Sequence, residues 1–404
     1  MRFLTSGESH GQALVAVIEG FPAQVRITKE EIDRELARRQ MGYGRGGRMK
    51  IESDQVEILS GVRQGLTIGS PICLQISNRD WVNWSSVMAP FHQSIPEEVV
   101  IKEDPRLPKL TTVVTVPRPG HADLSGALKY GFTDLRNIIE RASARETSAR
   151  VGVGAFAKQL LKEFGIRIGS YVLSIGKAGT GPVQPLTPDQ QEQVDQSPVR
   201  AFPPEAAEEM IRMIDQARQN QETLGGTFVV YATGLLPGLG SHVHWDRRLD
   251  GRLAQAVMSI PAIKGVGFGA GFKTAAFPGS QVQDPITYSP EIGFRRTGNN
   301  AGGIEGGMTN GEPLVLTAVM KPIPTLYQGL PSVDLKTLEP TRAGAERSDL
   351  TAVPAAGVVA EAMVAWVLAE AVLEKFGGDS LPEIKQAWLG YREGLRGKAK
   401  GGKC

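Results

Sequence analysis

The segment at residues 353–373 constrains the fold of this chain more than any other, because it is almost entirely apolar over about six helical turns. Pro354 suits the first turn of a helix, and the glycines at 377–378 are typical of a helix end. Glu361 and Glu370 interrupt the apolar run, which argues against a membrane span. The first residues also lack the apolar run of a signal segment. We therefore predict a long buried helix in a soluble, cytoplasmic protein.

Composition narrows the class of protein further. The 404 residues include 45 basic and 43 acidic side chains, and the net charge of +2 argues against a surface that wraps a polyanion. Any anion site must therefore be a local cluster. Two cysteines, Cys73 and Cys404, exclude a disulfide framework and cannot form a zinc set. The 48 glycines and 26 prolines indicate a loop-rich chain with many tight turns, and its length alone suggests two or three domains.

Two histidines lie in turns that glycine or proline shapes. Pro119 restricts the backbone and Gly120 permits a turn, so His121 is presented on a rigid loop rather than inside a helix or strand. His10 lies in a glycine-flanked turn between two apolar runs, which we predict as strands. Judged alone, a histidine in such a turn is more often a surface residue than a catalytic one.

A helix start follows the His121 turn. Ser143 and Glu146 have the capping-box spacing, and the apolar pattern beyond them predicts a helix over 144–164. The first-turn N–H groups and the guanidinium of Arg145 would then form an anion site. The alternative interpretation is that Ser143 and Glu146 only cap the helix and that Arg145 is a solvated charge.

A glycine-rich segment at 41–48 follows a predicted helix at 29–40. It formally matches a dinucleotide-binding fingerprint, but it follows a helix instead of a strand and lacks the later acidic residue, so we reject that interpretation. Arg45 and Arg48 within it, beside Arg39, indicate a mobile cationic clamp for phosphate or carboxylate. The alternative is a flexible basic loop without a specific ligand.

The remaining pattern alternates helices and strands. A strand followed by a glycine, proline and histidine turn occurs at 227–244 and, in part, at 13–22, which is consistent with an internal duplication. His242 and His244 lack further ligands at useful spacing apart from Asp246, so we predict structural roles and no metal site. We predict strands at 56–59, 71–77, 167–174, 227–232 and 313–320, helices at 29–40 (capped by Thr28 and Glu31), at 205–219 and from Asp246 to before Pro261, and a polar loop at 179–198.

Six motifs, in the same order along the chain, resemble those of the chorismate synthase family. The central one is Arg-Pro-Gly-His-Ala-Asp at 118–123 together with Ser-Ala-Arg-Glu-Thr at 143–147. The others are Gly-Glu-Ser-His-Gly at 7–11, Arg-Arg-Gln-Met-Gly-Tyr-Gly-Arg-Gly-Gly-Arg at 38–48, Gly-Gly-Ile-Glu-Gly-Gly-Met at 302–308, Lys-Pro-Ile-Pro-Thr at 321–325 and Glu-Arg-Ser-Asp at 346–349. Any one motif would be weak evidence, but six in register are specific.

The resemblance implies a fold and an activity. The fold would be α+β, with helices packed between antiparallel sheets in a β-α-β sandwich, as one domain at 1–394 followed by a disordered tail at 395–404. The activity would be an anti 1,4-elimination of phosphate from 5-enolpyruvylshikimate 3-phosphate, giving chorismate in the shikimate pathway of aromatic amino acid biosynthesis. The cofactor would be reduced FMN, and the assembly a homotetramer. No nicotinamide fingerprint survives inspection, so we favour an external flavin reductase over intrinsic NADPH-dependent reduction.

The resemblance also assigns residues. His10 would assist the departing phosphate as an acid, His121 would protonate the reduced flavin, and Asp349 would relay the proton removed from the substrate ring. Pro261 stands where the family usually has asparagine, which puts one side-chain contact to the flavin in doubt. The implied substrate-binding residues are Arg39, Arg45 and Arg48, and the implied flavin-binding residues are Ser143, Ala144, Arg145, Pro261, Ala262, Gly306, Lys321, Pro322, Ile323, Pro324, Thr325 and Arg347.

Two other functions remain open at this level. One is a phosphate-handling lyase or transferase without flavin, which a spectrum taken with oxidised cofactor would distinguish. The other is a nucleic-acid-binding module that uses the arginines at 38–48, which would show steep salt dependence. The nearly balanced charge already counts against the second.

Overall fold

The long apolar segment forms helix α11, Val353–Phe376, as predicted. The computed structural model describes residues 1–46, 53–91, 98–99, 110–111, 113–179, 181–344 and 349–399. Within these ranges α11 is the one helix long and apolar enough to cross a membrane, but 89% of its most apolar window is buried inside the protein. Helix α11 is therefore the centre of the core, with apolar side chains on all its faces.

Two antiparallel sheets flank this helix. Strands alternate buried and exposed residues where one face packs on the core, as Leu14, Ala16 and Ile18 do in β2. The four-stranded sheet has the order β1-β2-β6-β3, with β1 Arg2–Ser6, β2 Ala13–Glu19, β6 Ile72–Ser77 and β3 Val56–Ser60. The five-stranded sheet has the order β10-β9-β11-β17-β12, with β10 Ala178–Gly179, β9 Arg167–Ile175, β11 Gly226–Thr233, β17 Leu314–Met320 and β12 Ile263–Phe268.

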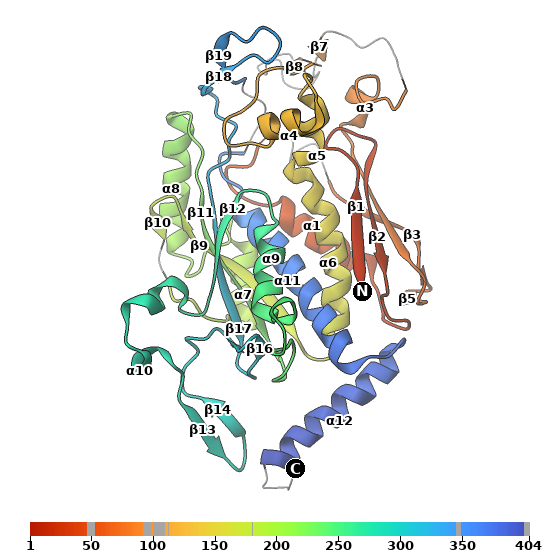
Figure 1. The fold of residues 1–404 in the computed structure, drawn as a ribbon, viewed down its shortest axis with the longest axis vertical. Coiled ribbons are helices and arrows are strands. Elements are labelled where there is room, and N and C mark those ends of the chain that lie inside the picture. Colours follow the sequence, from red (N-terminus) through yellow and green to blue (C-terminus); the bar gives the residue numbers. More distant parts are fainter. Residues whose placement is uncertain are drawn as a thin grey trace.

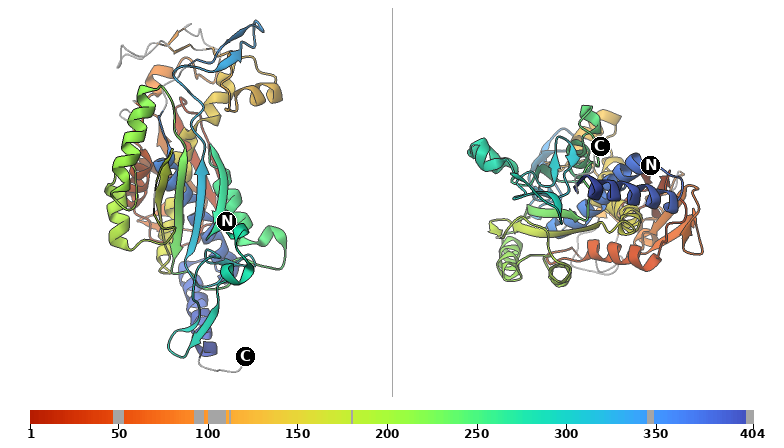
Figure 2. Two further views of the ribbon diagram at one scale, coloured as in Figure 1. Left: turned by 90° about the vertical axis from the view of Figure 1, so that its left-hand side faces the viewer. Right: turned by 90° about the horizontal axis from the view of Figure 1, so that it is seen from below.

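Helices pack against both sheets. Helix α6, Thr147–Lys162, contacts β2 and β6 of the four-stranded sheet and packs along α11, which contacts β9 and β11 of the five-stranded sheet (Figure 1). Helices α7, Pro188–Gln196, and α8, Ala206–Gln219, contact β9, and Figure 2 shows them on the outer face of that sheet. Mixed helices and antiparallel sheets confirm the predicted α+β class.

The other elements complete the layers or carry the loops above and below them. They are α1 Lys29–Gln40, β4 Val62–Arg63, β5 Leu66–Thr67, α3 Trp81–Trp84, β7 Glu98–Val99, β8 Leu110–Thr111, α4 Asp123–Tyr130, α5 Arg136–Ala142, η1 Ala144–Glu146, η2 Trp245–Arg247, α9 Leu249–Met258, η3 Gly271–Ala276, α10 Gly279–Val282, β13 Ile286–Ser289, β14 Gly293–Arg296, β15 Ile304–Glu305, β16 Met308–Thr309, β18 Pro331–Val333, β19 Pro340–Arg342 and α12 Leu381–Ala399.

Three local predictions about helices are wrong. Thr28 precedes α1 but its side chain makes no cap hydrogen bond, and its N–H donates to Gln159 of α6, where a capping box would use Glu31. Helix α9 begins at Leu249, after a short 3-10 turn that contains Asp246. The segment predicted as a polar loop at 179–198 contains α7, which starts with a capping box between Thr187 and Gln190.

The end of the chain differs in part from the predicted tail. Helix α12 runs to Ala399, so the first residues of the tail predicted at 395–404 are helical. The last part of that tail, residues 400–404, lies outside the described residues.

Candidate functional site

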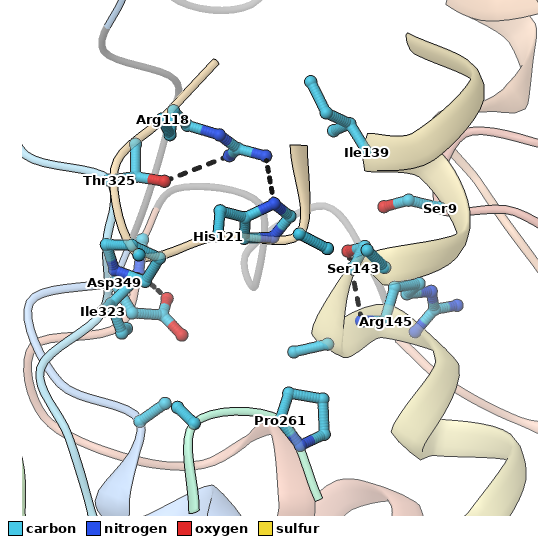
Figure 3. Close-up of a pocket in the computed structure, with 18 of the residues that line it drawn as sticks. Ser9, Arg118, His121, Ile139, Ser143, Arg145, Pro261, Ile323, Thr325 and Asp349 are labelled. Atoms are coloured by element: carbon cyan, nitrogen blue, oxygen red, sulfur yellow. Dashed lines mark hydrogen bonds between the residues drawn. The ribbon is translucent and has the colours of Figure 1, made fainter. Parts of the chain in front are cut away.

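A cavity of about 450 Å³ brings together residues from distant parts of the chain (Figure 3). Its walls include the His10 turn, the His121 turn, the end of α5 with the start of η1, and the segment after β17. The predicted site residues that line it are His10, Arg39, Arg45, His121, Ser143, Ala144, Arg145, Pro261, Ala262, Lys321, Ile323, Pro324, Thr325 and Asp349.

Four predicted site residues are not in this group. Pro322 belongs to the lining segment but is not among its described lining residues. Gly306 lies in the turn between β15 and β16, where a Cβ atom would meet His242 at 4.0 Å, and it does not line the cavity. Arg48 and Arg347 lie outside the described residues.

His10 is held by a carboxylate that the sequence reasoning missed. Its Nδ1 lies 2.9 and 3.0 Å from the two carboxylate oxygens of Glu140, and its backbone N–H donates to Oε2 at 2.8 Å. The imidazole stacks on Trp84 at 4.1 Å between ring centroids. Burial raises the pKa of Glu140, but hydrogen bonds from His10 and the charge of Arg136 outweigh it and hold that pKa below its usual value. An ionised Glu140 therefore faces Nδ1, which favours a proton on that nitrogen.

His121 has a similar arrangement. Its Nδ1 is hydrogen-bonded to Asp123, and a guanidinium nitrogen of Arg118 lies 3.1 Å from the same ring nitrogen. Burial raises the pKa of Asp123, but hydrogen bonds from His121 and Arg118 and their charges hold it well below its usual value. The carboxylate again orients the ring.

The His121 turn is joined to the segment predicted to bind flavin. Lys321 donates from Nζ to the carbonyl of Gly120 at 2.5 Å, and Arg118 donates to Oγ1 of Thr325 at 3.1 Å. Figure 3 shows Arg118 between Thr325 and His121. The two sides of the cavity wall are therefore bonded to each other directly.

Asp349 and Arg45 form an ion pair at the edge of the cavity. Nε of Arg45 lies 3.2 Å from Oδ2 of Asp349, and the N–H of Gly46 donates to Oδ1 at 2.6 Å. The glycine-rich segment was expected to hold a mobile clamp, yet only 9% of the Arg45 side chain is exposed. Asp349 thus holds the described end of this segment against the cavity.

Asp54 is a buried counter-charge to two arginines. Nη1 of Arg145 donates to both oxygens of Asp54 at 2.6 Å, and Nη1 of Arg39 lies 3.6 Å from Oδ2. Burial, together with the charges of Arg145 and Arg45, lowers the pKa of Arg39 to about 9 despite the attraction of Asp54. Positive charge is therefore crowded on this wall, which favours binding of an anion there.

The start of α6 differs from the predicted capping box. Ser143 accepts from the N–H of Arg145 at 3.3 Å, but the side chain of Glu146 bonds Thr5 and Arg150 instead of the backbone of Ser143. A 3-10 turn, η1, precedes the α-helix. The Arg145 guanidinium also donates to Asn78 at 2.8 Å, so it is buried and not the solvated charge of the alternative interpretation.

Ala262 has a strained backbone at the cavity wall. Its φ of 68° lies in the left-handed region, which an L-residue other than glycine adopts at a cost of about 1 kcal/mol or more. Its carbonyl accepts from the N–H of Lys321 at 2.9 Å. The backbone of the pair that departs from the family pattern, Pro261 and Ala262, is therefore held in place although the usual asparagine side chain is missing.

Several lining or supporting residues escaped the sequence reasoning. Arg118 and Asp123 belong to a quoted motif, so their closeness to His121 was a usable signal. Glu140 and Asp54 carry no local signal, because each meets its partner only in the folded chain. Among the described residues no group of three or more His, Cys, Asp or Glu side chains could hold a metal ion.

Comparisons with known proteins agree with the motifs. A family model described as chorismate synthase matches residues 1–373. Chorismate synthase of Moorella thermoacetica is 56% identical over 404 residues, covering 98% of this chain and 99% of its own, and that of Desulforudis audaxviator is 53% identical over 407 residues, covering 100% of each. A solved structure described as a crystal structure of chorismate synthase is 45% identical, with a TM-score of 0.77, and the match covers 98% of both chains.

Proposed function

Since the chain belongs to the chorismate synthase family, whose members are lyases, we propose that it eliminates phosphate from 5-enolpyruvylshikimate 3-phosphate to give chorismate. The observation that carries the proposal is one cavity in which two carboxylate-paired histidines face a cluster of arginines. The reaction is redox-neutral, because the substrate loses a proton and a phosphate and no electrons.

The arginine wall suits the substrate, which bears two carboxylates and a phosphate. Arg39 and Arg45 would bind these groups, together with Arg48 from the segment outside the described residues. The lowered pKa of Arg39 supports this assignment, because an anion beside it would relieve the repulsion from Arg145 and Arg45. The arginines that favour binding of an anion on this wall are therefore the residues that we propose to bind the substrate.

The histidines would act as acids. His10 would deliver a proton to the departing phosphate from Nε2, the ring nitrogen on the edge opposite Glu140. Because Nδ1 of His121 bonds Asp123, the ring would present Nε2 to the cavity and would donate a proton from it as the imidazolium. Asp349 would accept the proton removed from the substrate ring, and Arg347 would lie beside it.

The cavity also fits a flat anionic cofactor. One part of its lining consists of apolar residues, namely Ile139, Pro261, Ala262, Met320 and Ile323. Another part consists of the cationic side chains of the arginine wall. When bound, reduced FMN would supply electron density transiently to the elimination. The residues that would hold it are Ser143, Ala144, Arg145, Pro261, Ala262, Lys321, Pro322, Ile323, Pro324, Thr325 and Arg347. The family resemblance adds Gly306 to this set, although Gly306 does not line the cavity.

An anaerobic assay tests this function. Purified protein is given the substrate with FMN reduced by dithionite, with oxidised FMN alone, or with NADPH and FMN, and chorismate is measured by its absorbance. We expect turnover with reduced FMN and none with oxidised FMN. Turnover with oxidised FMN and no reductant would contradict the proposal. Turnover with NADPH and FMN would replace the external flavin reductase by an intrinsic one.

We further propose the arrangement that the family implies. It is a homotetramer in the cytoplasm, with residues 1–394 as one domain. Its layers would form a β-α-β sandwich, which the contacts of α6 with β2 and of α11 with β9 support. An internal duplication would relate its two halves. Light scattering of the purified protein tests the oligomeric state.

A further inference from the structure

The buried carboxylate beside His10 belongs to a residue that does not itself line the cavity. Glu140 lies on α5, and only 2% of its side chain is exposed. The cavity lining includes His10 and Arg136 but not Glu140. Any effect of Glu140 on the reaction must therefore pass through a neighbour.

Glu140 bonds the His10 turn at several points. Its carboxylate accepts from the backbone N–H of His10 and faces Nδ1, and its carbonyl accepts from the N–H of Ser9 at 2.9 Å. Nη1 of Arg136 lies 3.2 Å from Oε1 of the same carboxylate. Arg136 thus holds the carboxylate of Glu140 in place, and this carboxylate holds the imidazole of His10.

Trp84 limits the remaining freedom of the ring. The imidazole of His10 lies on the indole with an angle of 26° between the planes, and the guanidinium of Arg136 lies 5.0 Å from the same indole. The stacking fixes the plane of the ring, and the bond to Glu140 fixes its rotation within that plane. Nε2 then lies on the edge of the ring opposite Glu140, and His10 lines the cavity.

We propose that Glu140 is the positioning residue of the reaction, which keeps the neutral His10 protonated on Nδ1 and stabilises its imidazolium so that Nε2 can donate to the phosphate. This inference rests on the proposed function, because it assumes that His10 is the acid. A carboxylate at hydrogen-bond distance favours the protonated imidazole, and it does so more strongly in a buried site than in water.

The test compares Glu140→Gln with Glu146→Gln. Glu146 is also buried, six positions further along the chain, but its carboxylate bonds Thr5 and Arg150 and does not approach His10. We expect Glu140→Gln to lower kcat by about 10- to 100-fold, part of the roughly 10²- to 10⁴-fold that a positioned acid contributes, with a smaller change in KM. The pH dependence of kcat should change as well, because the charge beside the imidazole is removed. Glu146→Gln should leave kcat and its pH dependence unchanged.

A double-mutant cycle separates positioning from a general structural effect. In a His10→Ala background, Glu140→Gln should have no further effect on kcat, because the residue through which it acts is gone. An equal loss of kcat in both backgrounds, or a wild-type pH profile of Glu140→Gln, would overturn the proposal. Turnover by the wild-type protein in the same assay is judged separately, so failure of the proposed function cannot be mistaken for failure of this inference.

A measurement on the wild-type protein covers the case in which Glu140→Gln does not fold. The chain has five histidines, and ¹⁵N-histidine spectra assigned with a His10→Ala sample report which ring nitrogen carries the proton. We expect the neutral His10 to be protonated on Nδ1. A neutral His10 protonated on Nε2 would overturn the proposal without any activity measurement.

Discussion

His10 and His121 share one arrangement, in which a carboxylate bonds Nδ1 of a ring that lines the cavity. Two residues that the chain separates by more than a hundred positions have thus acquired the same environment. The carboxylates differ in origin, because Asp123 is a near neighbour of His121 while Glu140 is 130 positions from His10. Such pairing suits the acid roles that we propose for the two histidines.

We expect His10→Ala and His121→Ala to remain folded and to lower kcat by roughly 10²- to 10⁴-fold, the range for loss of a positioned acid. His244→Ala is the control, because that ring is largely exposed and bonds Asp246 away from the cavity. Turnover numbers and circular dichroism of the three variants check this. Wild-type turnover of the first two, or loss of activity that only follows unfolding, would contradict their catalytic roles.

Asp123 links the site to stability. Its pKa is depressed in the folded protein, so its contribution to stability is present above the unfolded pKa, about 3.9, and is lost as the pH falls through the folded value. We expect Asp123→Asn to lower the free energy of unfolding by about 1–3 kcal/mol at pH 7. Urea unfolding at several pH values measures the difference, which should shrink below about pH 4. A difference independent of pH would contradict the charge as its cause.

Helices α1, α6 and α11 meet around a buried cluster of charges. Glu361, in the middle of α11, is fully buried and accepts from Arg38 at 2.8 and 2.9 Å and from Lys158 at 2.5 Å. Arg200 lies 3.2 Å from it on the other side. Burial raises the pKa of Glu361, but these three cations hold it well below its usual value. Glu361, which indicated that this segment does not span a membrane, thus links α11 to α1 and α6.

We expect Glu361→Gln to destabilise the protein by about 3–5 kcal/mol, because it leaves three cations in the core without their shared carboxylate. Glu370→Gln, in the same helix, should cost less than about 1 kcal/mol, because that carboxylate is only partly buried and salt bridges of this kind contribute little. Burial also raises the pKa of Glu370, so its charged form is already disfavoured there. Chemical unfolding of both variants measures the contrast, and equal losses would contradict it.

The contact between α6 and α11 depends on a glycine. A Cβ atom at Gly154 would lie 2.3 Å from the Cβ of Ala362, closer than two atoms can approach, so the helices would have to move apart. We expect Gly154→Ala to destabilise by about 1–3 kcal/mol although alanine is the better helix former. At Gly152, two positions before it, the nearest atom is Leu74 Cδ1 at 3.5 Å, and Gly152→Ala should be neutral or stabilising by up to about 1 kcal/mol. Thermal unfolding of both variants tests the pair, and a stable Gly154→Ala protein would contradict it.

At the scale of the whole molecule, the cavity joins segments that lie far apart along the chain. Its lining runs from Ser9 near the start to Ala352 just before α11, and it touches loops that extend from both sheets. A ligand bound there contacts segments that would separate on unfolding. Binding should therefore stabilise the entire fold rather than one loop.

We expect FMN to raise the midpoint of thermal unfolding, because a ligand at about a hundred times its Kd adds about 2.7 kcal/mol to the stability of the state that binds it. Riboflavin, which lacks the phosphate, should raise the midpoint less, since it cannot engage the cationic side of the cavity. Differential scanning measurements with each ligand make the comparison. An unchanged midpoint with FMN, or an equal shift with both ligands, would contradict the assigned phosphate contact.

Local patterns in the sequence were enough to locate most of the elements. Helix α1 has the predicted bounds, and α11, β9 and β11 differ from prediction by a residue or two, because helical periodicity, apolar runs and glycine or proline ends are properties of neighbouring residues. The motifs that named the family also identified most of the residues that line the cavity.

Contacts across the chain were decided only by the tertiary structure. Thr28 and Glu31 have the spacing of a capping box, but the N–H of Thr28 donates to Gln159 of α6 instead. Glu140 and Asp54 look like any surface acid until folding places them beside His10 and Arg145, where burial makes each ion pair strong enough to hold the site. Burial and long-range pairing depend on all the elements at once, so no local stretch of sequence contains them.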